Sequence, residues 1–165
     1  MLKKKILLGV TGSIAAYKTA DLIRQLRQND YFVQVIMTKS AKEFITPLTL
    51  QALSGNPVLE NMWDSSEGNG MAHINLSRTA DLILIAPSSA NFIAKLAHGN
   101  ADDLLSNLCL ARKCPLLVAP AMNVEMYDNH ATQRNINTIK KDGILISGPE
   151  SGEHACGDHG MGRFI

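Results

Sequence analysis

The first residues able to do chemistry lie where a short apolar run ends near the N-terminus. The run Lys5–Gly9 is followed by Val10-Thr11-Gly12-Ser13. Glycines at such a turn let the backbone approach a ligand closely, and the first N–H groups of a following helix bind anions. Ser13 adds a hydroxyl donor. The segment therefore predicts an anion site, unless it is only a tight glycine turn before a capped helix.

The spacing of the glycines indicates which anion to expect. Gly9 and Gly12 match neither the G-x-G-x-x-G pattern of dinucleotide-binding folds nor the G-x-x-x-x-G-K-[ST] pattern of NTP-binding loops. The next apolar run ends in Met37-Thr38-Lys39-Ser40, which offers no carboxylate to an adenosine ribose. The pattern favours a mononucleotide phosphate over NAD.

Two further segments combine proline, small residues and asparagine directly after apolar runs. They are Ala86-Pro87-Ser88-Ser89-Ala90-Asn91 and Ala119-Pro120-Ala121-Met122-Asn123-Val124-Glu125-Met126-Tyr127. In open α/β sheets, ligands bind beyond the carboxyl ends of the strands. Small residues leave room for a flat ligand, and an amide can donate and accept hydrogen bonds at its edge. Either segment alone could be an ordinary β–α turn, but the two together favour one composite ligand site.

One histidine follows a segment that has no clear periodicity. Asn61–Met71 is rich in glycine and serine and predicts a surface loop or an active-site flap. His73 comes directly after it and is either structural or a general base, the usual role of histidine near neutral pH. We expect His98 and His130 to face solvent.

The three cysteines have different surroundings. Cys109 falls on the apolar face of a predicted helix, and Cys114 precedes a predicted strand. We expect both to act as small hydrophobic residues. Cys156 lies in the glycine-rich segment Gly152–Arg163, which either delivers a thiol and an arginine to a ligand or forms a disordered tail. The nearby histidines lack a fourth ligand and a standard zinc spacing, so no metal is expected.

The elements that must position these residues alternate between strands and helices. Nearly continuous apolar runs, one of them interrupted by a glutamine, predict strands over Lys5–Gly9, Phe32–Met37, Leu82–Ala86, Pro115–Ala119 and Ile144–Ser147. Periodic apolar residues or cap signals predict helices over 15–26, from Thr46-Pro47 to Gly55, over Asp102–Ala111 and over Ala131–Lys141. This alternation predicts an open, doubly wound α/β sheet in a single domain.

Composition excludes several classes of protein. The chain has 165 residues with a net charge of +1, 5% aromatic residues and three cysteines. These values disfavour a nucleic-acid binder, a stacking platform for single strands and a disulfide scaffold. No stretch approaches the ~20 apolar residues that a membrane span needs. The basic start, Lys3-Lys4-Lys5, precedes an apolar run too short for a signal peptide. We therefore expect a cytoplasmic protein with no nucleic-acid or membrane partner.

Taken together, these segments resemble the homo-oligomeric flavin-containing cysteine decarboxylases, and within them the phosphopantothenoylcysteine decarboxylases. The resemblance covers essentially the whole chain. Gly9–Ala16 is similar to the family's FMN phosphate loop, Pro87–Asn91 to its PASAN segment, and Pro120–Tyr127 to its PxMNxxMW motif. His73 falls at the family's active-site histidine. Ala155–Arg163 resembles the substrate-recognition clamp of the bacterial coenzyme A enzymes.

The resemblance implies a Rossmann-like or flavodoxin-like fold and roles for individual residues. Residues 1–147 would form the FMN-binding part and residues 148–165 a clamp of the same domain. The residues implied to bind the cofactor, FMN, lie in the loops after the strands: Gly12, Ser13, Ile14, Thr38, Ser40, Ser88, Ser89, Ala90, Asn91 and Ala121. The residues implied to bind substrate are Asn123, Met126, Ala155, Cys156 and Arg163.

The implied reaction is the FMN-dependent decarboxylation of 4′-phosphopantothenoylcysteine to 4′-phosphopantetheine and CO2. Oxidation of the substrate thiol to a thioaldehyde lets the carbanion left by CO2 delocalise into an enethiol, which reduced flavin then returns to the saturated product. In this scheme His73 is the base or handles the carboxylate, Asn123 holds the carboxylate and amide, and Cys156 donates a proton. The charge of Arg163 suits the substrate phosphate.

Alternatives within and outside the family stay open. The chain could be a peptidyl-cysteine decarboxylase of lantibiotic type, but those enzymes lack the cysteine clamp. It could be a flavin prenyltransferase, but the Pro-Ala-Met-Asn segment Pro120–Asn123 disfavours that. It could also be a non-catalytic flavin-binding regulator, but those proteins carry added acidic or extended tails, which this sequence lacks. Tyr127 replaces the family's tryptophan and Phe92 its threonine. The resemblance also implies a homotrimer or dodecamer, and a phosphopantothenoylcysteine synthetase either separate or covalently linked, in which case this chain is part of a bifunctional enzyme.

Overall fold

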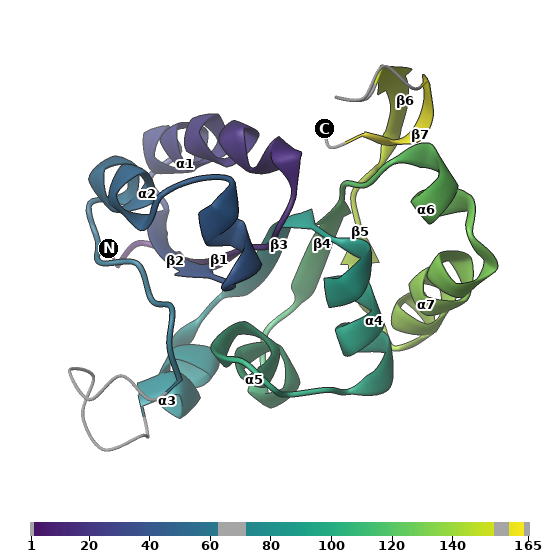
Figure 1. Ribbon diagram of the computed structural model, residues 1–165. Helices are drawn as coiled ribbons and strands as arrows, with labels where there is room; N and C mark the ends of the chain where they lie inside the picture. Colours follow the sequence, from purple (N-terminus) through teal and green to yellow (C-terminus); the bar gives the residue numbers. More distant parts are fainter. Residues whose placement is uncertain (1, 63–71, 154–158, 164–165) are drawn as a thin grey trace.

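Five parallel strands form the central sheet of the computed structural model, which describes residues 2–62, 72–153 and 159–163 (Figure 1). The strands are β1 (Lys5–Val10), β2 (Phe32–Met37), β3 (Leu82–Ser88), β4 (Leu116–Pro120) and β5 (Leu145–Ile146). Their order, β2-β1-β3-β4-β5, is that of flavodoxin-like folds and changes direction between β1 and β3. The predicted fold class is confirmed, although β5 is shorter than the predicted Ile144–Ser147.

Helices cover both faces of this sheet. They are α1 (Lys18–Gln28), α2 (Pro47–Ser54), α3 (Ala72–Thr79), α4 (Ala90–His98), α5 (Leu104–Ala111), α6 (Val124–Asp128) and α7 (His130–Lys141), with 3-10 turns η1 (Ile14–Tyr17) and η2 (Ser40–Glu43). The signals for α2 act as predicted, because the Thr46 hydroxyl accepts from the Thr49 N–H and Gly55 ends the helix at φ 77°.

The sequence pattern did not predict three of these helices, α3, α4 and α6. Each is short and begins within or directly after a segment interpreted as a loop. Helix α4 nevertheless buries Phe92 and Ile93, and α6 has no buried residue. A short helix needs tertiary packing more than propensity, so its apolar pattern is too brief to recognise from sequence alone.

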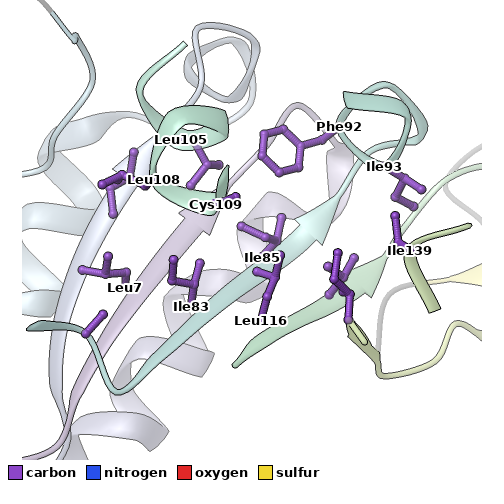
Figure 2. Close-up of a cluster of buried hydrophobic side chains, with 14 of the residues drawn as sticks. Leu7, Ile83, Ile85, Phe92, Ile93, Leu105, Leu108, Cys109, Leu116 and Ile139 are labelled. Atoms are coloured by element: carbon purple, nitrogen blue, oxygen red, sulfur yellow. The ribbon is translucent and has the colours of Figure 1, made fainter. Parts of the chain in front are cut away.

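The apolar runs of the strands supply two separate cores. Leu7 faces helices α4, α5 and α7, where it joins Ile85 and other buried side chains (Figure 2). Its neighbours Ile6 and Leu8 point to the opposite face and pack with buried residues of α1 and α2. Successive side chains of a strand point to opposite faces, so a strand covered on both sides must be apolar throughout. The continuous runs were therefore correctly interpreted.

The C-terminal segment differs from its prediction as a loop or tail. The described parts form two antiparallel strands, β6 (Glu150–Glu153) and β7 (His159–Arg163). Residues 154–158 lie outside the described part of the chain, as do residues 63–71 of the predicted loop or flap. Backbone hydrogen bonds stabilise a hairpin whatever its side chains, so a glycine-rich sequence gives no side-chain pattern that would predict it.

Among the described helices, none is long and apolar enough to span a membrane.

Candidate functional site

The carboxyl ends of four strands meet along one edge of the sheet, where backbone hydrogen bonds connect their loops. Three such bonds cross from strand to strand, from the N–H of Thr38 to the carbonyl of Val10 (3.0 Å), from Thr11 to Pro87 (3.3 Å) and from Ala121 to Ser88 (3.0 Å). The predicted cofactor residues therefore share this edge, at the point where the strand order reverses. Open α/β sheets bind their ligands at such a position.

The loop after β1 approaches the loop after β2 so closely that residue 12 must be glycine. A Cβ atom on Gly12 would lie 2.6 Å from the Cβ of Ser40. The following Ser13 caps η1, because its hydroxyl oxygen accepts from the Ala15 N–H at 3.1 Å. Its hydroxyl proton can still donate to a ligand. The first turn is a 3-10 turn that leads into α1, rather than the direct α-helical start expected.

The two serines of the segment Pro87–Asn91 lie in different environments, Ser88 at the end of β3 and Ser89 directly after it. Ser88 is fully buried in the strand. Ser89 caps α4 through its hydroxyl, which accepts from the Phe92 N–H at 3.1 Å. Ala90 and Asn91 then form the first turn of α4, and Asn91 is exposed. The ordinary turn-and-cap interpretation is therefore correct, and it also directs the N–H groups of the first helical turn outwards from the edge of the sheet.

The loop after β4 presents an amide group in the same way. The Asn123 side-chain oxygen accepts from the Met126 N–H at 2.9 Å and caps α6. This leaves the amide nitrogen of Asn123 as a donor on an exposed side chain. Met126 is 48% exposed. The cap thus fixes the direction of the amide while both side chains stay accessible to a ligand.

Both departures from the family pattern occupy packing positions. Phe92 is buried in the core cluster of Figure 2. Tyr127 packs against the same cluster, and its carbonyl accepts from the Gln133 side chain at 2.6 Å, which links α6 to α7. Both residues therefore contribute to the packing of α4 and α6.

The C-terminal hairpin lies beside the loop that carries Asn123. Strand β7, which ends at Arg163, contacts α6, the helix that Asn123 caps (Figure 1). Ala155 and Cys156 lie outside the described residues. The hairpin β6–β7 and the segment Pro120–Asn123 are therefore neighbours in the fold, although they are separated in the sequence.

The structure does not bring His73 to this group within one chain. His73 is in the first turn of α3, which packs against α5. In Figure 1, α3 lies at the opposite end of the molecule from α6 and the hairpin. Of the residues implied to be catalytic, the two that the structure describes, His73 and Asn123, are thus not brought together within a single chain.

Comparison with known proteins identifies the family. A family model described as Flavoprotein matches residues 1–165. The chain belongs to the Flavoprotein family. A flavin is therefore the cofactor expected at the edge of the sheet.

Two sequence relatives cover nearly all of this flavoprotein. It is 55% identical over 162 residues to the "Coenzyme A biosynthesis bifunctional protein CoaBC" of Vibrio vulnificus strain YJ016, covering 98% of the chain and 40% of the relative. It is 51% identical over 163 residues to a "Probable phosphopantothenoylcysteine decarboxylase" of Streptococcus mutans, covering 98% of the chain and 91% of the relative. The chain thus spans less than half of CoaBC but almost the full length of the second protein.

Solved structures share the fold over the same length. The FMN-dependent cysteine decarboxylase SpaF matches with a TM-score of 0.86 and 34% identity, covering 96% of this chain and 89% of SpaF. A cysteine-to-serine mutant of PPC decarboxylase, complexed with pantothenoylaminoethenethiol, matches with a TM-score of 0.85 and 33% identity, covering 99% and 92%. The chain therefore has the same fold as these two decarboxylases.

The residues along the edge fit a flavin phosphate. Ser13 and Ser40 lie on loops in close contact, and the loops carry hydroxyl and backbone N–H donors with no acidic side chain among the implied cofactor residues. Ile14 next to them is 61% exposed, which offers apolar surface to an aromatic ring. A neutral donor set beside exposed apolar surface is suited to a ligand with a phosphate and a flat ring.

The charged groups around α4 stabilise the helix that Ser89 caps. The Lys95 ammonium lies 2.9 Å from Asp102 and 3.2 Å from Asp103. Burial alone would lower the pKa of Lys95, but the hydrogen bonds to the two carboxylates outweigh it and raise that pKa. The ion pairs hold the far end of α4 against the start of α5. They lie outside the donor set of the edge.

The two cysteines that the structure describes are not activated thiols. Burial raises the pKa of Cys109 to about 12 and also raises that of Cys114. A nucleophilic cysteine usually has a lowered pKa. Their interpretation as small hydrophobic residues agrees with Cys109 being buried and Cys114 partly buried. Among the described residues, no cluster of His, Cys, Asp or Glu could hold a metal ion.

Proposed function

We propose that this flavoprotein is an FMN-dependent phosphopantothenoylcysteine decarboxylase, which converts 4′-phosphopantothenoylcysteine to 4′-phosphopantetheine and CO2. The observation that carries the proposal is the 51% identity to a probable phosphopantothenoylcysteine decarboxylase, over 98% of this chain and 91% of that protein. The match to PPC decarboxylase complexed with pantothenoylaminoethenethiol supports the same substrate class. The name of the CoaBC relative supports a role in coenzyme A biosynthesis.

The choice of FMN as the flavin rests on the loops after β1 and β2. The close approach of Gly12 to Ser40 supports a phosphate site between these loops. The end of β2 lacks the carboxylate that binds the ribose of a dinucleotide. SpaF, which shares the fold, is described as FMN-dependent. A flavin supplies oxidation of the substrate cysteine before CO2 is lost and reduction afterwards.

The substrate would lie between α6 and the C-terminal hairpin. The free amide hydrogens of Asn123 would bind the substrate carboxylate, because the side-chain oxygen is already used by the Met126 N–H. Met126 offers exposed apolar surface beside it. The contact of β7 with α6 supports a role for Arg163 at the substrate phosphate. Ala155 and Cys156 would cover the substrate.

Two residues would handle protons. His73 would accept a proton or orient the carboxylate, and Cys156 would return a proton to the carbon that loses CO2. A thiol with an unperturbed pKa of ~8.5 is still protonated near neutral pH and is acidic enough to donate. The other residues that we propose to contact FMN are Ile14, Thr38, Ser88, Ser89, Ala90, Asn91 and Ala121.

A homo-oligomer, such as a trimer or dodecamer, would complete the site. The separation of α3 from α6 within one chain supports this (Figure 1), because His73 of one chain could then join Asn123 of another. A synthetase partner, linked or separate, is consistent with CoaBC being more than twice as long as the matched region. We further propose a cytoplasmic location.

A second candidate is a peptidyl-cysteine decarboxylase, favoured by the structural match to EpiD complexed with a substrate peptide (TM-score 0.83, 28% identity). The test compares two substrates with the FMN-loaded protein, 4′-phosphopantothenoylcysteine and a peptide ending in cysteine. CO2 release is followed for each. We expect release from the first substrate only. Faster release from the peptide would support the second candidate and contradict the proposal.

A further inference from the structure

The two strands at the reversal point, β1 and β3, stop pairing before their loops begin. Their register ends with Gly9 opposite Ile85. Strand β3 continues through Ala86 to Pro87, and proline has no N–H to donate to a neighbouring strand. Beyond this point one backbone bond joins the two loops, from the Thr11 N–H to the Pro87 carbonyl at 3.3 Å.

Two buried threonine hydroxyls bind the carbonyls at this junction. Thr11, after β1, donates to the Pro87 carbonyl at 2.7 Å. Thr19, on α1, donates to the Ala86 carbonyl at 3.1 Å. The exposed fractions of these threonines are 1% and 0%. These buried hydroxyls add side-chain hydrogen bonds to the one long backbone bond at the junction.

Thr11 also makes a contact that Thr19 does not make. Its hydroxyl oxygen accepts from the Ser89 N–H at 2.9 Å, and Ser89 is the residue that caps α4. Thr11 therefore holds Pro87 and Ser89 together, directly before Gly12 and Ser13 in the chain. One side chain fixes the loop after β3 relative to the loop after β1.

We propose that Thr11 is a positioning residue that sets the distance between these two loops and so determines the affinity for FMN. The inference rests on the proposed function, because it takes FMN as the ligand that both loops contact. Without the hydroxyl, the Ser89 N–H loses its partner and the Pro87 carbonyl keeps only the longer bond from the Thr11 N–H (3.3 Å). An unpaired group at a partly buried position favours movement of the loop towards another partner.

The test measures the FMN dissociation constant of flavin-free protein by quenching of FMN fluorescence. Thr11→Val keeps the shape of the side chain and removes the hydroxyl. We expect its affinity for FMN to fall about tenfold, or ~1.4 kcal/mol, the size of one or two hydrogen bonds. Thr11→Ser, which keeps the hydroxyl, should restore binding.

Thr19→Val is the matched control, because it also removes a buried hydroxyl from a β3 carbonyl but leaves the Ser89 N–H paired. We expect a lower melting temperature and an FMN affinity within about twofold of the wild type. If Thr11→Val does not fold, the comparison of Thr11→Ser with Thr11→Ala isolates the same hydroxyl.

Three results would overturn the inference. FMN affinity unchanged in Thr11→Val is one, and Thr19→Val weakening FMN equally is another. Equal FMN affinities of Thr11→Ser and Thr11→Ala would be the third. In each case the wild type still binds FMN, so the proposed function stands. A wild-type protein that binds no FMN would overturn the proposed function, and this inference with it.

Discussion

At the scale of single residues, polar side chains of the site serve two purposes. Ser13, Ser89 and Asn123 each cap a helix or turn with an oxygen atom. Each keeps a donor hydrogen for a ligand. A substitution to alanine would therefore remove a cap and a ligand contact at once, so variants that keep the cap are needed to separate the two effects.

Asn123→Asp is such a variant. Aspartate caps helices about as well as asparagine, so we expect the free energy of unfolding to stay within about 0.5 kcal/mol of the wild type. The added negative charge replaces the amide donor and repels the substrate carboxylate, so kcat/KM should fall at least about tenfold. Urea unfolding and steady-state kinetics measure the two effects. Wild-type kcat/KM in this variant would show that the amide does not bind the carboxylate.

Cys156→Ser tests the proton donor. A serine hydroxyl is a far weaker acid than a thiol, so we expect the variant to release CO2 but to accumulate the unsaturated enethiol. Mass spectrometry of the reaction mixture distinguishes the enethiol from 4′-phosphopantetheine. Formation of the saturated product at the wild-type rate would mean that another group donates the proton.

Cys109 gives a prediction about pH. Burial raises the pKa of its thiol from 9.0 to about 12, so the unfolded chain loses this proton at a lower pH than the folded chain. The stability due to the buried neutral thiol is complete below pH 9.0 and is lost as pH rises towards about 12. Urea unfolding across this range should therefore show a steeper loss of stability in the wild type than in Cys109→Ala. Equal slopes would contradict the burial of a neutral thiol.

At the scale of the elements, alanine substitutions at Gly9 and Gly12 should have different effects on folding stability and on FMN affinity. A Cβ on Gly9 would lie 2.7 Å from the core side chains Ile85 and Leu105, whereas a Cβ on Gly12 would meet Ser40. We expect Gly9→Ala to cost about 1–3 kcal/mol of stability by overpacking and to leave FMN affinity little changed. Gly12→Ala should weaken FMN binding by about tenfold or more, since it pushes the two loops apart. Urea unfolding and FMN titration of both variants test this contrast, and the reverse pattern would contradict it.

The sequence predicted the strands more accurately than the helices between them. A strand buried on both faces, such as β1, is recognisable from its own residues. Helix α4 is not, because its Ser89 cap and Phe92 anchor occupy a segment that also suits a loop. The hairpin β6–β7 depends on backbone pairing, which leaves no periodic signal in a glycine-rich segment.

The site was predictable in part for the same reason. Ser13, Ser89 and Asn123 lie along one edge as predicted, because each follows a strand of a parallel sheet. The link made by Thr11 could not be predicted, since the partners of a hydroxyl depend on which loop the fold places beside it. The distance of His73 from Asn123 also depends on the folded chain, because spacing along the sequence does not determine it.

At the scale of the whole molecule, we expect the active site to combine residues of two chains. His73→Asn alone should release no CO2 while still binding FMN, and Asn123→Asp alone should keep at most about a tenth of the wild-type kcat/KM. Refolding the two variants together creates some sites with a wild-type His73 from one chain and a wild-type Asn123 from the other. We expect partial recovery of CO2 release in the mixture. No recovery, although mixed oligomers form, would place both residues in one chain.

The central claim is that the edge formed by four strand ends is the flavin site of a phosphopantothenoylcysteine decarboxylase. The most direct test incubates the purified, FMN-loaded protein with 4′-phosphopantothenoylcysteine that is isotope-labelled in its carboxyl group. The labelled CO2 and the mass of the organic product are then measured. We predict stoichiometric labelled CO2 and 4′-phosphopantetheine. A protein that binds FMN but leaves the labelled substrate intact would contradict the claim.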